Sequence, residues 1–149
     1  MPEATPGFKR QLREAFDELE VGRTFTFRRT FTDGDVVLFC GVTGDYNPYH
    51  QDAEFAGESF YGRLTIPGLL TGSMLTHIGG MLGFLATEMR FEYLAPVYAR
   101  DTITCLVTIL EKDETQRRMH CGADFTNQEG FPVLRASFSG FPGQVRLSR

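Results

Sequence analysis

The sequence is poor in cysteine, and its metal-binding side chains are scattered. Its three cysteines, Cys40, Cys105 and Cys121, include no Cys-x-x-Cys pair, and an odd number cannot all pair within one chain. Neither a disulfide scaffold nor a cysteine metal site is therefore predicted. Histidine and acidic residues show no ligand clustering either, so no metal is expected. We expect reduced, buried thiols in a cytoplasmic protein.

The chain also lacks an excess of positive charge and the glycine loops of nucleotide-binding proteins. A net charge of −4 argues against a nucleic-acid surface. No Walker-type or Rossmann-type glycine pattern is present. Residues 1–7 contain no apolar run, so no secretory signal is expected. A chain of 149 residues without repeats or linkers is expected to form one domain, 1–149.

One long stretch, residues 64–87, has no Asp, Glu, Lys or Arg. Its length is that of a membrane-spanning helix, and a helix apolar all round belongs either in a membrane or in a protein core. The stretch also contains several hydroxyl residues and five glycines: Gly68, Gly72, Gly79, Gly80 and Gly83. We therefore favour a central helix, running from Pro67–Gly68 to about residue 85 and enclosed by a curved sheet.

Elements of both types flank this central helix. Apolar residues at helical spacing predict an amphipathic helix over residues 8–20. A strand over 24–31, a helix from Thr32 or Asp33 to near Gly44 and a short helical turn at 53–57 follow. Strands are expected at 86–93, 101–110, 117–125 and 132–141, with turns at 112–114 and 127–130, before a polar tail over 143–149. The pattern predicts an α+β domain whose antiparallel sheet wraps around the long helix.

The most informative motif lies at residues 43–52, where Asp45 and His50 flank an Asn47-Pro48 turn. Asn favours turns and Pro fixes φ, so both side chains can project from one short segment toward a common point. A carboxylate and an imidazole that converge on one water molecule form a general acid–base pair near neutral pH.

Gly44, Asp45, Asn47, Pro48 and His50 resemble the signature of the MaoC-like, (R)-specific enoyl-CoA hydratases. The similarity covers roughly residues 20–140, including Pro67-Gly68 and a Phe91, Pro96-Val97 and Asp101 run. It implies the hotdog fold and a lyase of fatty acid metabolism, which hydrates trans-2-enoyl-CoA to (R)-3-hydroxyacyl-CoA. No cofactor beyond the coenzyme A thioester carrier is implied. A homodimer is expected, with a partner covering the exposed sheet edge.

The resemblance assigns roles to three residues. Asp45 and His50 are the implied catalytic pair that shares the attacking water, although an isolated Asp here would suit an Asx turn and an isolated His a backbone contact. The Gly68 N–H, at a helix N-terminus, is implied to hold the thioester carbonyl, or Gly68 serves the turn and packing alone. Related hydratases commonly have a histidine before this glycine, where this chain has Pro67.

Two further residues are candidates for support. Asn47 either orients the catalytic pair by hydrogen bonding or only forms the turn before Pro48. Ser73 matches a family serine near the pair and would hold Asp45 in place, or it is a small residue for tight helix packing.

The remaining polar and aromatic candidates are not expected to take part in the chemistry. Tyr46 and Tyr49 are expected to line or cover the pocket. Arg100 is interpreted as a solvated loop residue rather than a contact to coenzyme A phosphates. His77 could reach the ligand pocket from the long helix, but it is interpreted as a core histidine with its hydrogen bonds satisfied. His120 is interpreted as exposed or edge-facing.

Two other functions stay open. An acyl-CoA thioesterase of the same architecture needs a carboxylate and an oxyanion site but no Asn-Pro-x-His arrangement. A non-catalytic acyl-thioester binding protein would keep the fold alone. A dehydratase of acyl-carrier-protein thioesters would use the same chemistry with another carrier.

Overall fold

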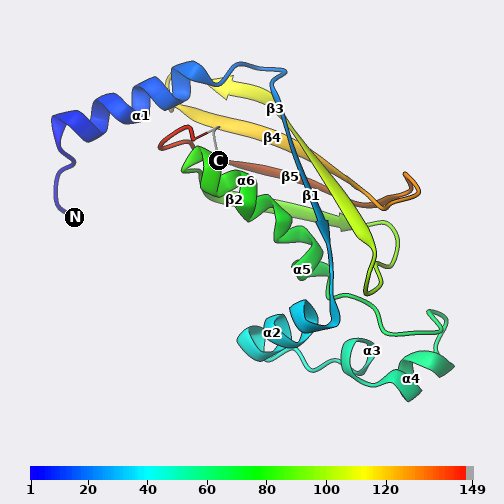
Figure 1. Ribbon diagram of the computed structural model, residues 1–149. Helices are drawn as coiled ribbons and strands as arrows, with labels where there is room; N and C mark the ends of the chain where they lie inside the picture. Colours follow the sequence, from blue (N-terminus) through cyan, green and yellow to red (C-terminus); the bar gives the residue numbers. More distant parts are fainter. Residues whose placement is uncertain (147–149) are drawn as a thin grey trace.

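The computed structural model of the chain describes residues 1–146 and consists of six helices and five strands (Figure 1). The helices are α1 (Pro6–Glu18), α2 (Asp33–Thr43), α3 (Pro48–Gln51), α4 (Ala53–Glu58), α5 (Gly68–Gly72) and α6 (Met74–Leu82). The strands are β1 (Thr24–Thr30), β2 (Leu85–Tyr93), β3 (Thr102–Asp113), β4 (Arg118–Thr126) and β5 (Pro132–Phe141).

The strands form one antiparallel sheet in the order β1-β3-β4-β5-β2. All five predicted strands are confirmed, with β3 continuing to Asp113, beyond its expected end. The sheet curves around α5 and α6 (Figure 1), so the predicted α+β arrangement is confirmed.

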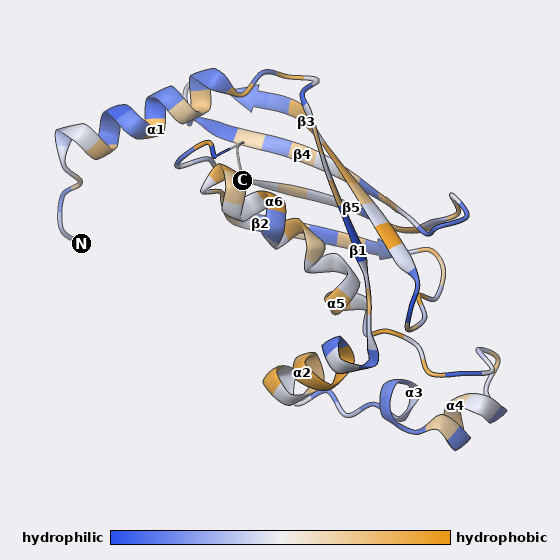
Figure 2. Ribbon diagram, in the orientation of Figure 1, coloured by the Kyte–Doolittle hydropathy of each residue, from blue (hydrophilic) through white to orange (hydrophobic). Residues whose placement is uncertain are grey.

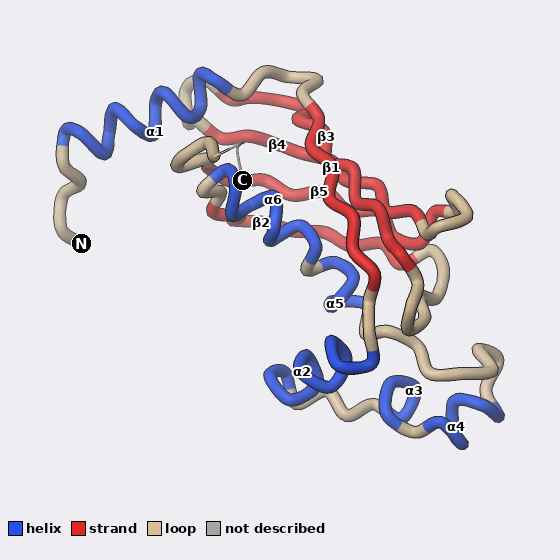
Figure 3. The backbone as a smooth tube through the Cα atoms, in the orientation of Figure 1, coloured by secondary structure: helices blue, strands red, loops and turns tan. Residues whose placement is uncertain are grey.

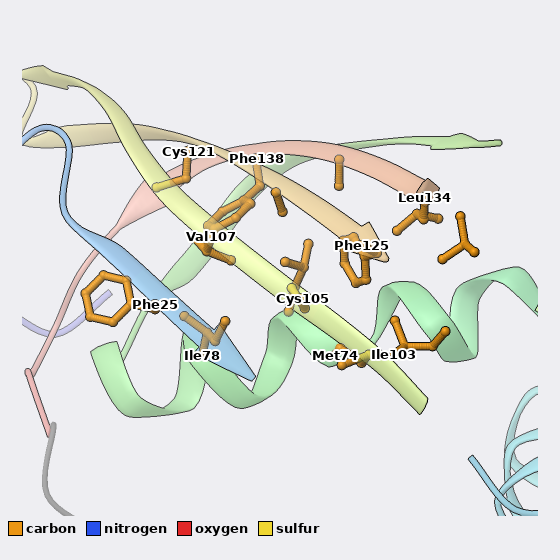
Figure 4. Close-up of a cluster of buried hydrophobic side chains, with 14 of the residues drawn as sticks. Phe25, Met74, Ile78, Ile103, Cys105, Val107, Cys121, Phe125, Leu134 and Phe138 are labelled. Carbon is orange, nitrogen blue, oxygen red and sulfur yellow. The ribbon is translucent and has the colours of Figure 1, made fainter. Parts of the chain in front are cut away.

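The core lies between α6 and the face of the sheet that it covers (Figure 4). Side chains alternate between the two faces of a strand, and every second residue of β3, from Ile103 to Ile109, is buried. All three cysteines are buried and free, as predicted. Burial raises the pKa of the Cys105 and Cys121 thiols to about 12, because the thiolate would lose its hydration, and nearby Asp124 adds to the shift at Cys105.

The prediction of one continuous central helix was wrong, because the structure has two helices, α5 and α6. The helix is interrupted at Ser73, whose hydroxyl donates to the Leu70 carbonyl at 2.6 Å and competes with helical hydrogen bonding. It ends at Leu82, before the expected residue 85, because Gly83 adopts a left-handed conformation with φ of 53°. No helix within residues 1–146 is long and apolar enough to cross a membrane.

The close approach of helix to sheet depends on the glycines of α5, one of which is Gly72. A Cβ atom on Gly72 would lie 2.7 Å from the Phe91 ring of β2, so a side chain there would push α5 off the sheet. Gly79 has no such neighbour nearer than 3.9 Å. The packing role expected for small residues therefore holds at Gly72 and not at Gly79.

The C-terminal segment, predicted as a polar tail, is hydrogen-bonded to α6. The backbone N–H groups of Gly143 and Gln144 donate to the Leu82 carbonyl, each at 3.1 Å. The Gln11 side chain of α1 donates to the Gly143 carbonyl at 3.0 Å. Residues 143–146 of the predicted polar tail are therefore anchored to α6 and α1, and residues 147–149 lie outside the described part of the chain.

Gly140 is expected to be the glycine least tolerant of substitution. A Cβ atom there would lie 2.1 Å from the Leu85 carbonyl oxygen and 2.8 Å from the Ala86 Cα, both backbone atoms that cannot swing aside. Gly140→Ala should lower the free energy of unfolding by about 1–3 kcal/mol, the usual cost of overpacking. Urea denaturation measures this loss.

Gly41→Ala is the matched control, because nothing lies within 4 Å of its Cβ position in α2. It should leave stability unchanged or raise it, since Ala is the better helix former. Equal stability of the two variants would contradict the packing argument.

Helices α2, α3 and α4 gather at one end of the sheet, beyond α5 (Figure 3). Much of α2 is apolar (Figure 2), and Val37, Leu38 and Val42 are exposed on it. The functional motif lies in this group of helices, between α2 and α3.

Candidate active site

The Asp45–His50 segment is shaped by Gly44 and Asn47. Gly44 ends α2 in a left-handed conformation with φ of 73°, and its N–H donates to the Cys40 carbonyl. Asn47 caps α3: its Oδ1 accepts from the Tyr49 N–H at 3.2 Å, and its carbonyl accepts from the His50 N–H at 2.9 Å. These contacts form the bend that the sequence predicted around Asn47-Pro48.

The two motif side chains face each other across this bend. His50 Nε2 and Asp45 Oδ2 lie 3.9 Å apart, too far for a direct hydrogen bond. A separation of this size allows one water molecule to contact both groups. Asp45 Oδ1 also accepts from the Asn47 N–H at 3.2 Å, so Asn47 contacts the acid through its backbone and caps α3 with its side chain.

Thr65 orients the His50 ring. Its carbonyl oxygen lies 2.7 Å from His50 Nδ1, and a carbonyl can only accept, which assigns the proton of the neutral imidazole to Nδ1. The lone pair is then on Nε2, the nitrogen that faces Asp45. His50 is thereby set to act as a base at Nε2. Thr65 was missed by the sequence analysis, because a backbone contact across 15 residues leaves no pattern in the sequence.

Asp45 and His50 border a cavity of about 620 Å³ that also reaches α5, β2 and β5. Much of its lining is apolar, with a few polar groups near the motif, which is the usual character of a small-molecule site. The lining includes Asn47, Tyr49, Tyr61, Thr65, Ile66, Pro67, Gly68, Thr71, Tyr93, Val97, Val133 and Leu134.

Gly68 is brought to the same cavity as the motif pair. It is the first residue of α5, so its N–H has no acceptor inside the helix. A Cβ atom on it would lie 2.5 Å from the Tyr93 ring, which gives glycine a packing role as well. Pro67 precedes the helix as its N-cap and makes no side-chain capping bond.

Ser73 is not brought to the motif. Its hydroxyl is bonded to the Leu70 carbonyl, and the residue lines a second cavity, between α2, β1 and α6, together with Phe27 and His77. Among the described residues, no hydrogen bond joins Ser73 to Asp45. The structure therefore supports the packing interpretation of Ser73. It shows no contact by which Ser73 would hold Asp45 in place.

The other histidines differ from their predicted places. His77 is exposed on α6 and stacks on Phe27 with ring centroids 3.8 Å apart, so the prediction of a core histidine was wrong. His120 lies half-buried on β4, the middle strand of the sheet, and its Nδ1 is 2.8 Å from the Ser139 hydroxyl. The prediction of an exposed or edge-facing His120 was wrong as well.

Tyr49 lines the cavity and packs edge-on against Tyr61, whereas Tyr46 is exposed and does not line it. Arg100 is exposed, as predicted for a solvated loop residue, and its guanidinium lies 3.8 Å from the Asp33 carboxylate. Within residues 1–146, no three His, Cys, Asp or Glu side chains gather as metal ligands would.

Comparison with known proteins agrees with this architecture. A 3-hydroxybutyryl-CoA dehydratase from Methylorubrum extorquens is 30% identical over 107 residues, which make up 69% of this chain and 68% of that protein. An (R)-specific enoyl-CoA hydratase from Rhodospirillum rubrum is 24% identical over 98 residues, 63% of this chain and 68% of the relative.

The solved structure of R-hydratase PhaJ1 from Pseudomonas aeruginosa superimposes with a TM-score of 0.80 at 24% identity, covering 90% of this chain and 91% of that one. This likeness confirms the predicted hotdog fold. Residues 17–129 match the family described as "MaoC like domain". The chain therefore belongs to the MaoC-like family of hydratases and dehydratases.

Proposed function

We propose that this protein reversibly hydrates trans-2-enoyl thioesters to (R)-3-hydroxyacyl thioesters. The observation that carries the proposal is the Asp45–His50 pair, 3.9 Å apart on the wall of a largely apolar cavity. Water held between the two groups attacks C3 of the enoyl group. The pair accepts one proton from this water and delivers a proton to C2, so the reaction is redox-neutral and needs no cofactor beyond the thioester carrier.

Gly68 supplies the second part of the proposal. Its N–H, free of helical partners, donates to the thioester carbonyl and stabilises the negative charge that develops there as water adds. The largely apolar lining of the cavity lowers the local dielectric constant, which strengthens this interaction.

Two assays on one sample test the function. Hydration of crotonyl-CoA removes the enoyl absorbance and releases no thiol, whereas a thioesterase would release free coenzyme A. Hydratase turnover should be seen without thiol release, and the product should be the (R) enantiomer. Thiol release alone, or stabilisation by acyl-CoA without turnover, would contradict the proposal. Crotonyl thioesters of coenzyme A and of an acyl carrier protein, compared side by side, identify the preferred carrier.

The proposal includes a homodimer formed at the β2 edge of the sheet. The outer edge of β2 has no strand partner among residues 1–146, and Leu85 and Tyr93 on it are 75% and 53% exposed. An unpaired edge strand with exposed apolar side chains such as these favours pairing with a second copy. In sedimentation experiments the protein should show twice the 16.8 kDa mass of one chain.

Leu85→Lys should weaken this association because it places a charge on the edge. Leu106→Lys is the control, since Leu106 is 40% exposed on the inner strand β3, and it should remain dimeric. A wild-type monomer at micromolar concentration would contradict the dimer while leaving the chemistry untouched.

A further inference from the structure

Thr71 carries a buried hydroxyl without a hydrogen-bond partner. The residue is 2% exposed, and its Oγ1 contacts no donor or acceptor in residues 1–146. Burying a hydroxyl with no partner is costly, and such groups are rare in folded proteins. The position therefore calls for a polar partner that comes from outside the chain.

The neighbouring hydroxyls of Ser73 and Thr76, unlike that of Thr71, have hydrogen-bond partners. Ser73 donates to the Leu70 carbonyl at 2.6 Å, and Thr76 donates to the Ser73 carbonyl at 2.7 Å. Both use the helix backbone to satisfy the hydroxyl, as Ser and Thr commonly do. Thr71, on the same pair of helices, makes no such bond.

The place of Thr71 indicates where its partner enters. It lines the cavity that holds Asp45 and His50. It also follows Gly68 by three residues on α5, so the two share a face of the helix, and helical side chains tilt toward the N-terminus. The Thr71 side chain thus lies toward the end of α5 at which the Gly68 N–H is located.

Besides Thr71, one side chain near this end of α5 carries a donor: Tyr93, whose ring lies against Gly68. Pro67 has neither a backbone N–H nor a polar side chain. Ile66, Val97 and Leu134, which line the same cavity, are apolar. A carbonyl oxygen bound beside Gly68 would therefore have one backbone donor and two hydroxyls in this part of the chain. Tyr93 is 53% exposed, so its hydroxyl can bond water, whereas the Thr71 hydroxyl is buried and has no partner among residues 1–146.

We propose that Thr71 is a catalytic residue whose hydroxyl, closed to solvent in this structure, turns by rotation about χ1 when substrate binds and donates the second hydrogen bond to the thioester carbonyl. This inference rests on the proposed hydratase function. Thr71 keeps its proton throughout. Its O–H stabilises the negative charge on the carbonyl oxygen while water adds to C3, and the charge is lost again when C2 is protonated.

Thr71→Val is the first test, because valine keeps the shape of threonine and removes only the hydroxyl. The kcat for crotonyl-CoA should fall by on the order of 10²-fold, as for the loss of one oxyanion donor. The melting temperature should stay the same or rise, since an unsatisfied buried polar atom is removed. Thr71→Ser keeps a donor and should retain most of the wild-type kcat. If valine packs poorly, Thr71→Ala tests the same loss.

A spectroscopic readout separates carbonyl binding from packing. The conjugated thioester 2,4-hexadienoyl-CoA absorbs at longer wavelength when donors polarise its carbonyl. At saturation the wild type and Thr71→Ser should shift this band to the red, and Thr71→Val should shift it less.

Wild-type kcat and an unchanged red shift in Thr71→Val would overturn the role of Thr71 and leave the hydratase proposal intact. A wild-type protein that neither hydrates crotonyl-CoA nor shifts the probe would overturn both.

Discussion

Asp45→Asn is expected to lower the kcat for hydration of crotonyl-CoA by about 10²- to 10⁴-fold, the usual contribution of a general acid–base group. An amide cannot accept a proton from the attacking water. The substitution leaves the local structure in place, because the asparagine Oδ1 can still accept from the Asn47 N–H, as Asp45 does at 3.2 Å. The melting temperature should therefore stay close to that of the wild type, and the loss should appear in kcat.

Asp52→Asn is the matched control, with the same chemical change seven residues later. Asp52 caps α4, accepting from the Glu54 and Phe55 N–H groups at 3.0 Å, and asparagine caps helices equally well. Asp52 does not line the cavity, so this variant should keep wild-type activity. Activity of Asp45→Asn equal to that of Asp52→Asn would remove Asp45 from the mechanism.

His50→Asn should cause a loss of similar size, about 10²- to 10⁴-fold in kcat. The asparagine amide can replace the Nδ1–H donor that contacts the Thr65 carbonyl at 2.7 Å. Nothing replaces Nε2, the nitrogen that faces Asp45. The variant therefore keeps the anchor of the side chain and loses the base. Steady-state kinetics at several pH values, together with the melting temperature, measure the effect.

His77→Asn serves as the comparison for this histidine change. His77 is exposed, stacks on Phe27 and lies outside the Asp45 cavity. Its replacement should cost little activity. If both histidine variants lost activity equally, the loss could not be assigned to proton transfer at His50.

The fold was predictable wherever local chemistry sets the boundary of an element. Thr32 starts α2 through a reciprocal capping box with Asp35, with hydrogen bonds of 3.2 and 2.9 Å, so the predicted N-cap is confirmed. The break at Ser73 was not predictable, because a serine in a helical run favours continuation or interruption depending on where its hydroxyl bonds. His120 was misplaced because strand alternation gives the face of a residue but not the order of the strands.

The residues of the motif could be predicted from the sequence, whereas the contacts of the residues around it could not. Asp45, His50 and Gly68 share a cavity, as the predicted chemistry requires. Ser73 does not join them, because it lies five residues after Gly68 and lines the second cavity. Thr71 could have been found as a hydroxyl one turn after Gly68, on the same side of the helix. Whether it has a partner depends on packing that only coordinates reveal.

The two ends of the segment between His50 and Thr65 are held together by hydrogen bonds. The Thr65 N–H donates to the Tyr49 carbonyl at 2.9 Å, and the Thr65 carbonyl meets His50 Nδ1 at 2.7 Å. Both ends of this segment thus meet beside Asp45 and His50, while α4 and the residues after it lie farther out. Lengthening this segment costs little conformational entropy, because the entropy of loop closure grows slowly with loop length. Changes in this segment can therefore alter the cavity wall at Tyr61 while the Asp45–His50 geometry stays fixed.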